Sequence, residues 1–190
     1  MPTDELDDRL KKILGQYRTS FSGKTYAEEN DDVDPLMAVF GITPSLKREN
    51  RQYWGRELGM CWQLLVSELF RLRRRDYSPA LRIGDDEPCD FCFGQNAVDT
   101  KYRIGSGDSG TLKKFKVYGK VLIERSYRPI LLIVRQDNLA AAITACETGR
   151  WKVLTGQESF DFIRKEADFD LEAWLKRCQA SEEFVIQRSK

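Results

Sequence analysis

Residues 88–103 read PCDFCFGQNAVDTKYR. The runs 91–93 and 97–103 favour extended chain, because aromatic and β-branched residues are common in strands. Gly94-Gln95 between them is typical of a tight hairpin turn with glycine in its first central position. The stretch therefore predicts a β-hairpin, and its register determines which side chains come together.

The hairpin register brings two aspartates and a lysine to one face. A two-residue turn, or a four-residue loop, pairs Asp90 with Asp99 at a Cβ separation of about 5 Å. The period of two along a strand puts Lys101 on the face of Asp99. A three-residue turn would oppose Asp90 to Thr100 and separate the group.

Like charges opposed across a strand ladder are destabilising, so both carboxylates need a compensating cation. Lys101 is one candidate, and Mg²⁺ held by Asp90 and Asp99 is the other, because carboxylates and substrate phosphate are its usual ligands. Such a metal polarises a phosphoryl oxygen and acidifies bound water, and a neighbouring lysine can orient that water. The alternative is a solvated hairpin with a cross-strand ion pair.

The composition predicts a soluble protein with one domain. The chain has 190 residues, of which 41% are hydrophobic and 32% charged. No apolar run reaches membrane-spanning length, and the acidic start MPTDELDDRL is not a signal peptide, so we expect a cytoplasmic protein that does not enter membranes. The absence of histidine excludes Ser-His-Asp triads, histidine zinc sites and histidine-based nucleases.

The five cysteines are predicted to be reduced thiols, because the chain shows no export signal. Cys89 and Cys92 form a lone C-x-x-C pair without a second pair for zinc. If they lie on a strand, their side chains point to opposite faces. Packing is therefore favoured over a metal or redox role.

Charge is distributed in blocks around the hairpin. Residues 47–75 sum to +5, residues 76–100 to −5 and residues 101–128 to +6. An acidic cluster between basic stretches is the pattern expected if phosphates are held on both sides of a metal centre. Chance is the competing account in a chain with this many charges.

The strongest helical pattern covers residues 48–74. Its apolar residues recur at spacings of three and four and predict one buried stripe, consisting of Trp54, Leu58, Cys61, Leu65, Leu69 and Leu72. Glu57 and Glu68 flank the same edge of that stripe. Either they simply reach solvent or an arginine, or one of them joins the aspartates.

The remaining elements predict a mixed sheet between helices. A short helix over 1–15 leads into an irregular arm over 16–46, and a strand is expected at 81–84. After the hairpin come a glycine-rich loop at 104–110, a helix over 111–126, a buried strand from Pro129 onward, a helix over 138–147 and a strand over 151–154. Two final helices are expected, at 159–166 and 171–178.

This order, together with PCD at 88–90 and DTK at 99–101, resembles the PD-(D/E)XK nuclease superfamily, and within it a type II restriction endonuclease. The resemblance covers residues 50–155. It implies an α/β fold with a restriction-endonuclease-like mixed β-sheet flanked by helices, built on an α-β-β-β-α-β core. The 190 residues then form a single nuclease domain, with an N-terminal helix and arm (1–46), a catalytic core (48–155) and C-terminal helices (156–190).

The resemblance implies roles for four residues. Asp90 and Asp99 match the metal-binding acids, Lys101 matches the motif lysine, and Glu57 fits the additional helix glutamate, with Glu68 in reserve. The pattern departs from the family at Cys89, which separates the proline from Asp90. Asp85 and Asp86 therefore stay open as substitutes for Asp90.

The implied activity is Mg²⁺-dependent, sequence-specific hydrolysis of double-stranded DNA, usually by a homodimer. Phosphate contacts are expected from side chains of the two basic stretches and the glycine-rich loop, namely Arg73, Arg74, Arg103, Ser106, Lys113, Lys114 and Lys116. A nuclease for branched or damaged DNA, such as a junction resolvase or repair enzyme, is the first alternative. A DNA-binding module without catalysis is the second.

Overall fold

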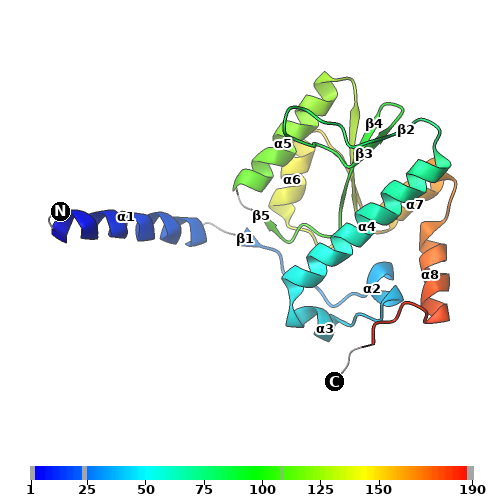
Figure 1. The fold of residues 1–190 in the computed structure, drawn as a ribbon, viewed down its shortest axis with the longest axis horizontal. Helices are drawn as coiled ribbons and strands as arrows, with labels where there is room; N and C mark the ends of the chain where they lie inside the picture. The colour runs from blue at the N-terminus through cyan, green and yellow to red at the C-terminus, as the bar shows by residue number, and fades with distance from the viewer. Residues whose placement is uncertain (1–2, 23–24, 108, 188–190) are drawn as a thin grey trace.

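The structure is a computed structural model that describes residues 3–22, 25–107 and 109–187. Figure 1 shows a sheet between helices, with the N-terminal helix projecting away from it. The helices are α1 (Thr3–Ser22), α2 (Pro35–Val39), α3 (Pro44–Glu49), α4 (Arg51–Arg73), α5 (Ser109–Glu124), α6 (Ala140–Thr148), α7 (Gln157–Ala167) and α8 (Leu171–Ser181). The strands are β1 (Thr25–Tyr26), β2 (Tyr77–Pro79), β3 (Phe91–Phe93), β4 (Asn96–Lys101), β5 (Ser106–Gly107), β6 (Arg128–Ile133) and β7 (Lys152–Thr155).

The main sheet has five strands in the order β2-β3-β4-β6-β7. Strand β3 pairs antiparallel with both β2 and β4, whereas β6 pairs parallel with both β4 and β7. The helix α5 connects β4 to β6 and α6 connects β6 to β7, as parallel pairing requires. The predicted α/β class with a mixed sheet flanked by helices is confirmed.

Each face of the sheet carries its own hydrophobic core. Helices α4, α7 and α8 cover one face, and α5 and α6 cover the other. Strand β6 serves both cores, because Ile130 and Leu132 point to the first while Leu131 and Ile133 point to the second. This confirms the prediction that the apolar run after Pro129 is a strand buried on both faces.

The predicted hairpin register is confirmed. Gly94 has a φ of 50°, and β3 pairs with β4 through Phe93↔Asn96, Cys92↔Ala97 and Phe91↔Val98. Glycine adopts a positive φ without steric cost, which is why a two-residue turn forms here. The regular pairing ends at Phe91↔Val98, and the predicted pairing of Asp90 with Asp99 does not form, because the Asp90 N–H also donates to the Val98 carbonyl.

The buried face of α4 differs from the predicted stripe. Leu58, Trp62, Val66 and Phe70 face the core, at a constant spacing of four, and the indole Nε1 of Trp62 donates to the Leu132 carbonyl at 3.2 Å. Most of the predicted stripe is only partly buried, and Leu72 is exposed. The helix carries apolar residues around much of its circumference, so periodicity alone placed the core face one residue off.

Three further predictions were wrong in position. The arm contains two short helices, α2 and α3, each begun by a capping Asp34 or Thr43 and a following proline. The first outer strand is β2, whereas Ile83 in the predicted strand 81–84 forms only an isolated bridge with Asp86. Part of the glycine-rich loop is strand β5, which pairs with β1.

Buried charges hold the polar segment before α2 against the sheet. Arg135 follows β6 and is almost fully buried; it donates to Asp137 at 2.9 and 3.0 Å and to the carbonyls of Asn30 and Asp32. The Tyr102 hydroxyl, at the end of β4, donates to Asp34. The arm is therefore ordered by pairing with the ends of the central strands. None of the described helices is long and apolar enough to cross a membrane.

Candidate active site

The Asp90 carboxylate is bound by Thr100, the residue of β4 between Asp99 and Lys101. Its Oδ2 accepts from the backbone N–H of Thr100 at 2.7 Å and from the Thr100 hydroxyl at 2.6 Å. Its Oδ1 accepts from the Gln63 amide at 2.8 Å. Three donors thus orient one carboxylate, and two of them come from the residue between Asp99 and Lys101.

Asp99 and Lys101, the two neighbours of Thr100 in the chain, form an ion pair with each other. The Lys101 Nζ lies 2.8 Å from Asp99 Oδ2 and donates to the Thr100 carbonyl at 3.0 Å. The Asp99 side chain is 14% exposed and that of Lys101 39%. The lysine head therefore reaches the solvent side of the site, while the carboxylate lies beneath it.

Burial controls the protonation of both groups. Burial raises the pKa of Asp99 to about 6; the Lys101 ammonium opposes this rise and the Asp90 charge adds to it. Burial also disfavours the charged form of Lys101, but the carboxylates of Asp99 and Asp90 outweigh it and raise the lysine pKa above its ordinary value. Asp90, Asp99 and Lys101 thus interact electrostatically.

The structure corrects the predicted common face for the three residues. Asp99 and Lys101 point toward α5, whereas Asp90 binds Thr100, which points to the α4 side. The cause is local: the Asp90 N–H donates to the carbonyl of Val98, the residue already paired with Phe91, which is an irregularity of the β-bulge type. The bulge turns the Asp90 carboxylate to the edge of β4 instead of directly above Asp99.

A pocket of about 180 Å³ lies over Asp99 and Lys101. Helix α5 supplies Thr111, Lys114 and Tyr118 to its wall, and Trp151 and Phe115 supply apolar surface. The exposed Lys114 lines the same pocket as Lys101, and the acids Glu87 and Asp99 line it as well, so two lysines and two acids border one space. Lysine ammonium groups bind anions such as phosphate.

The oxygen donors of the site suit a hard divalent cation. The carboxylates of Asp90 and Asp99 lie on either side of Thr100, and carboxylate oxygens are typical ligands of Mg²⁺. A cation there would also relieve the cost of ionising the buried Asp99. Within the described ranges no group of three or more Asp, Glu or Cys side chains forms a metal-binding cluster, so protein carboxylates would provide only part of the coordination.

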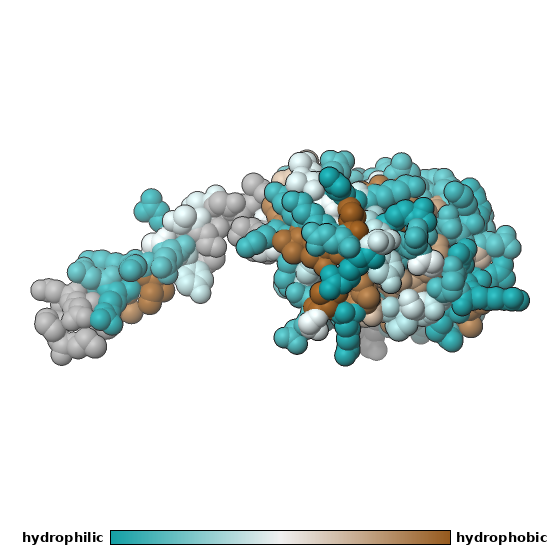
Figure 2. Space-filling view, turned by 90° about the horizontal axis from the view of Figure 1, so that it is seen from above, coloured by the Kyte–Doolittle hydropathy of each residue, from teal (hydrophilic) through white to brown (hydrophobic). Residues whose placement is uncertain are grey.

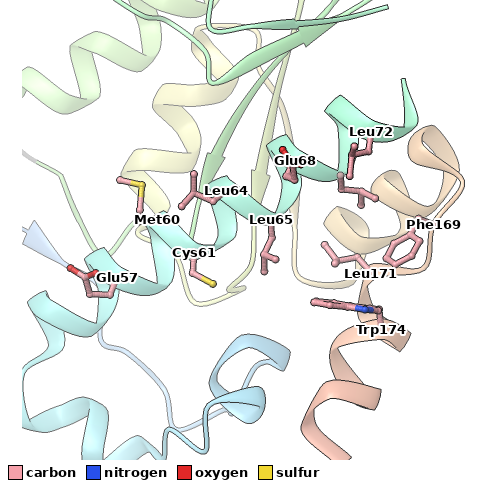
Figure 3. A pocket seen from close by; sticks show the side chains of 11 residues that line it. Glu57, Met60, Cys61, Leu64, Leu65, Glu68, Leu72, Phe169, Leu171 and Trp174 are labelled. Carbon is pink, nitrogen blue, oxygen red and sulfur yellow. The ribbon is translucent and has the colours of Figure 1, made fainter. Parts of the chain in front are cut away.

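Glu57 does not lie with the aspartates. It is exposed, forms an ion pair with the neighbouring Arg56 at 2.9 Å, and lines an apolar groove on the outer side of α4. Figure 3 shows Glu57 and Glu68 along this groove, away from the hairpin. Glu68 is likewise paired with Arg71, which lowers the glutamate pKa by hydrogen bonding. The misplaced core face explains the wrong position predicted for both.

Gln63 is the α4 residue that reaches the site, and sequence reasoning did not find it. It follows Trp62, so it lies at the edge of the sheet-facing side. A correct assignment of the buried face would have pointed to it. Of the reserve acids, Asp85 is exposed, whereas Asp86 accepts from the hydroxyl of Tyr118 in the pocket wall at 2.6 Å, a bond that raises the tyrosine pKa to about 12.

The predicted phosphate-binding arginines are engaged inside the protein. Arg73 donates to the Ala167 carbonyl at 3.0 Å, and Arg74 binds Asp76 and the Glu166 carbonyl. These bonds tie the end of α4 to the end of α7. Their guanidinium groups therefore have a structural use that competes with DNA contact.

The other predicted DNA-binding residues fall into two groups. Arg103 donates to the carbonyls of Ala27 and Asp137 at 2.9 Å and so has a structural role. The second group is exposed on β5 and α5. Its members are Ser106, Lys113, Lys114 and Lys116. The three lysines make no ion pair with any other described residue. Of these three lysines, Lys114 lines the Asp99 pocket.

Cys89 and Cys92 lie on the same face, because Cys89 precedes β3 and does not follow its alternation. Both are buried, and their sulfur atoms are 3.6 Å apart. All five cysteines are free thiols, as predicted. The pair therefore packs in the core below the site.

Comparison of the sequence with protein-family models and with curated proteins, and of the structure with solved structures, finds no match. The functional argument rests on the geometry of the site.

Proposed function

We propose that this chain is a Mg²⁺-dependent, sequence-specific endonuclease of double-stranded DNA, a type II restriction enzyme that acts in the cytoplasm as a homodimer. The observation that carries the proposal is the meeting of Asp90, Asp99 and Lys101 around the Thr100 peptide. The order α4-β2-β3-β4-α5-β6 supports it, since the α-β-β-β-α-β core is the one that the resemblance implies.

Each residue has a definite part in phosphodiester hydrolysis. Asp90 and Asp99 hold Mg²⁺, which when bound polarises a phosphoryl oxygen and acidifies water. Lys101 orients the attacking water and stabilises the negative charge that develops on the phosphate. Lys114 binds a phosphate oxygen at the mouth of the pocket, and Gln63 keeps the Asp90 carboxylate in position.

The decisive experiment is incubation of the purified protein with plasmid DNA and Mg²⁺. Discrete bands support the restriction enzyme, and cleavage of branched DNA alone would support a resolvase. Asp99→Ala and Lys101→Ala are each expected to reduce the cleavage rate at least ~100-fold, the scale of losing a charge-stabilising group. Gln63→Leu keeps the metal ligands and should reduce the rate about tenfold, since it removes one orienting hydrogen bond.

Gln179→Leu provides the matched control, because Gln179 is exposed on α8. It should cleave like the unchanged protein. Salt-dependent DNA binding without any cleavage, at every Mg²⁺ concentration, would contradict the nuclease and indicate a binding module.

A further inference from the structure

Cys89 and Cys92 form a pair of adjacent thiols that the sequence pattern does not predict. Residues three apart on a regular strand point to opposite faces, and that expectation favours packing over a redox role. In the structure Cys89 precedes β3, and the two sulfur atoms lie 3.6 Å apart on one side of the sheet. The geometric reason against a redox role therefore does not hold in the folded protein.

The pair is close enough for a disulfide bond to form after a small local movement. A disulfide bond is about 2.0 Å long, so the two sulfur atoms have to approach each other by about 1.6 Å. Cys89 lies outside the regular strand, where the backbone is not fixed by ladder hydrogen bonds on both sides. A shift of Cys89 toward Cys92 can supply the movement.

The chain between the two cysteines carries Asp90. The Asp90 N–H donates to the Val98 carbonyl, and the resulting bulge turns the carboxylate toward Thr100. The same departure from strand alternation brings Cys89 to the side of Cys92. Because one local irregularity places the sulfur atoms and orients the carboxylate, drawing the sulfur atoms together moves the backbone that holds Asp90.

The edge of the sheet gives a small molecule access to the pair. Whereas the apolar side of α1 lies on the outside of the molecule (Figure 2), Cys89 and Cys92 are only 1% and 2% exposed. Ser78 of β2 is directly opposite Cys92, so the two side chains share a face, and Ser78 is exposed. Strand β2 has three residues and lies at the sheet edge, where local opening requires little free energy. Opening of β2 uncovers Cys92.

We propose that Cys89 and Cys92 are a reversible oxidation site, at which a low-molecular-weight disulfide such as oxidised glutathione converts the two thiols into one disulfide bond. The Cys92 sulfur attacks one sulfur of the small disulfide, which forms a mixed disulfide and releases the first small thiol. Cys89 then attacks the Cys92 sulfur and releases the second small thiol. The protein loses two electrons and the two thiol protons, and both small thiols carry them away.

The new bond is expected to switch off the candidate active site. It draws Asp90 away from Thr100 and Gln63, which otherwise hold its carboxylate. This consequence rests on the proposed function, in which Asp90 holds Mg²⁺. We expect the oxidised protein to cleave DNA at least ~10-fold more slowly than the reduced protein, and a thiol reductant to restore the rate.

Equilibration of the full chain with mixtures of oxidised and reduced glutathione tests the bond itself. After the remaining thiols are alkylated, trypsin cleavage at Arg82 and Lys101 releases residues 83–101, which contain Cys89 and Cys92 and no other cysteine. We expect the mass of this peptide to fall by two hydrogen atoms and the peptide to take up no alkylating agent in the oxidising mixtures. Alkylation of both cysteines in every mixture would overturn the proposal.

Two variants assign the bond to this pair. Cys92→Ala should leave residues 83–101 without an internal bond, and its cleavage rate should not change with the glutathione mixture. Cys178→Ala removes a thiol on α8 and should behave like the unchanged protein. Urea unfolding checks that both variants are folded, and oxidation that persists in Cys92→Ala would contradict the assignment.

Hydrogen exchange of the Thr100 amide follows Asp90 without any cleavage. The Thr100 N–H donates to Asp90 Oδ2 at 2.7 Å, so its protection reports whether the carboxylate is in place. We expect this amide to exchange at least ~10-fold faster in the oxidised chain, because its hydrogen bond is lost. A disulfide bond that leaves both this exchange and the cleavage rate unchanged would refute the switch.

These measurements separate the oxidation site from the nuclease. A chain that forms the bond and exposes Thr100, but cleaves no DNA when reduced, would support the oxidation site and contradict the nuclease. Equal cleavage by the reduced and the oxidised chain would support the nuclease and contradict the switch.

Discussion

At the scale of single residues, Asp99 depends most on its surroundings. A carboxyl group with a pKa near 6 is partly protonated in mildly acidic solution, whereas an exposed aspartate is fully ionised there. Burial raises this pKa because it disfavours the charged form. In the proposed magnesium site the metal needs the ionised form, so the metal and a proton would compete for the same oxygen atoms.

The pH dependence of metal binding follows from that competition. We expect the affinity for Mg²⁺ to fall about tenfold per pH unit below about pH 6 and to level off above about pH 7, measured by calorimetry without DNA. In the metal-free protein the stability of the fold changes with pH in the opposite direction: a raised carboxyl pKa stabilises the fold below about pH 4, and this contribution is lost as pH rises through about 6. Asp85→Asn replaces an exposed acid and should leave both pH profiles unchanged. An affinity for Mg²⁺ that does not change between about pH 5 and 8 would contradict the role of Asp99.

At the scale of elements, the hairpin was predictable and the face of α4 was not. A two-residue turn is a local property, since Gly94 with a positive φ suffices to set the register of β3 and β4. The buried face of α4 depends on which other elements reach it. Trp62 and Phe70 fill the space over the sheet, while Leu64 and Leu72 are left outside although they are equally apolar.

Substitutions at two glycines test whether the hairpin turn requires glycine: Gly94 has a positive φ in the turn, whereas Gly55 lies in helix α4. Gly94→Ala should lower the free energy of unfolding by about 1–2 kcal/mol, because alanine resists a positive φ. Gly55→Ala in α4 meets no atom within 4 Å and should raise it by about 0.5–1 kcal/mol. Urea unfolding measures both, and equal effects at the two positions would show that the turn does not depend on glycine.

At the scale of the whole molecule, the basic blocks of the sequence have two different uses. Arg73, Arg74 and Arg103 bind carbonyl and carboxylate oxygens within the protein, whereas Lys113, Lys114 and Lys116 of α5 remain exposed on the surface. The net charge of a sequence segment cannot separate these uses. A lysine or arginine adds the same charge to the segment whether it is bound inside the protein or exposed on the surface. The positive surface available to DNA is therefore smaller than the sequence indicates.

Salt dependence of DNA binding distinguishes the two groups of cations. Replacing Lys113, Lys114 and Lys116 together by glutamine should reduce the slope of log affinity against log salt by about 3, since each phosphate contact contributes about 0.9. Arg73→Gln with Arg74→Gln should leave the slope unchanged and lower the stability of the fold instead. Fluorescence anisotropy with a DNA duplex at several salt concentrations measures the slope, and an arginine effect larger than that of the lysines would refute this assignment.

The sequence by itself determined the hairpin, its turn and the spacing of Asp99 and Lys101, because these follow from the period of a strand and the conformational freedom of one glycine. Only the tertiary structure decided that a bulge turns Asp90 toward Thr100, that Gln63 rather than Glu57 reaches it, and that an apolar groove stays open on α4. These features depend on contacts between residues far apart in the chain, and the pattern along one element carries no information about what packs against it.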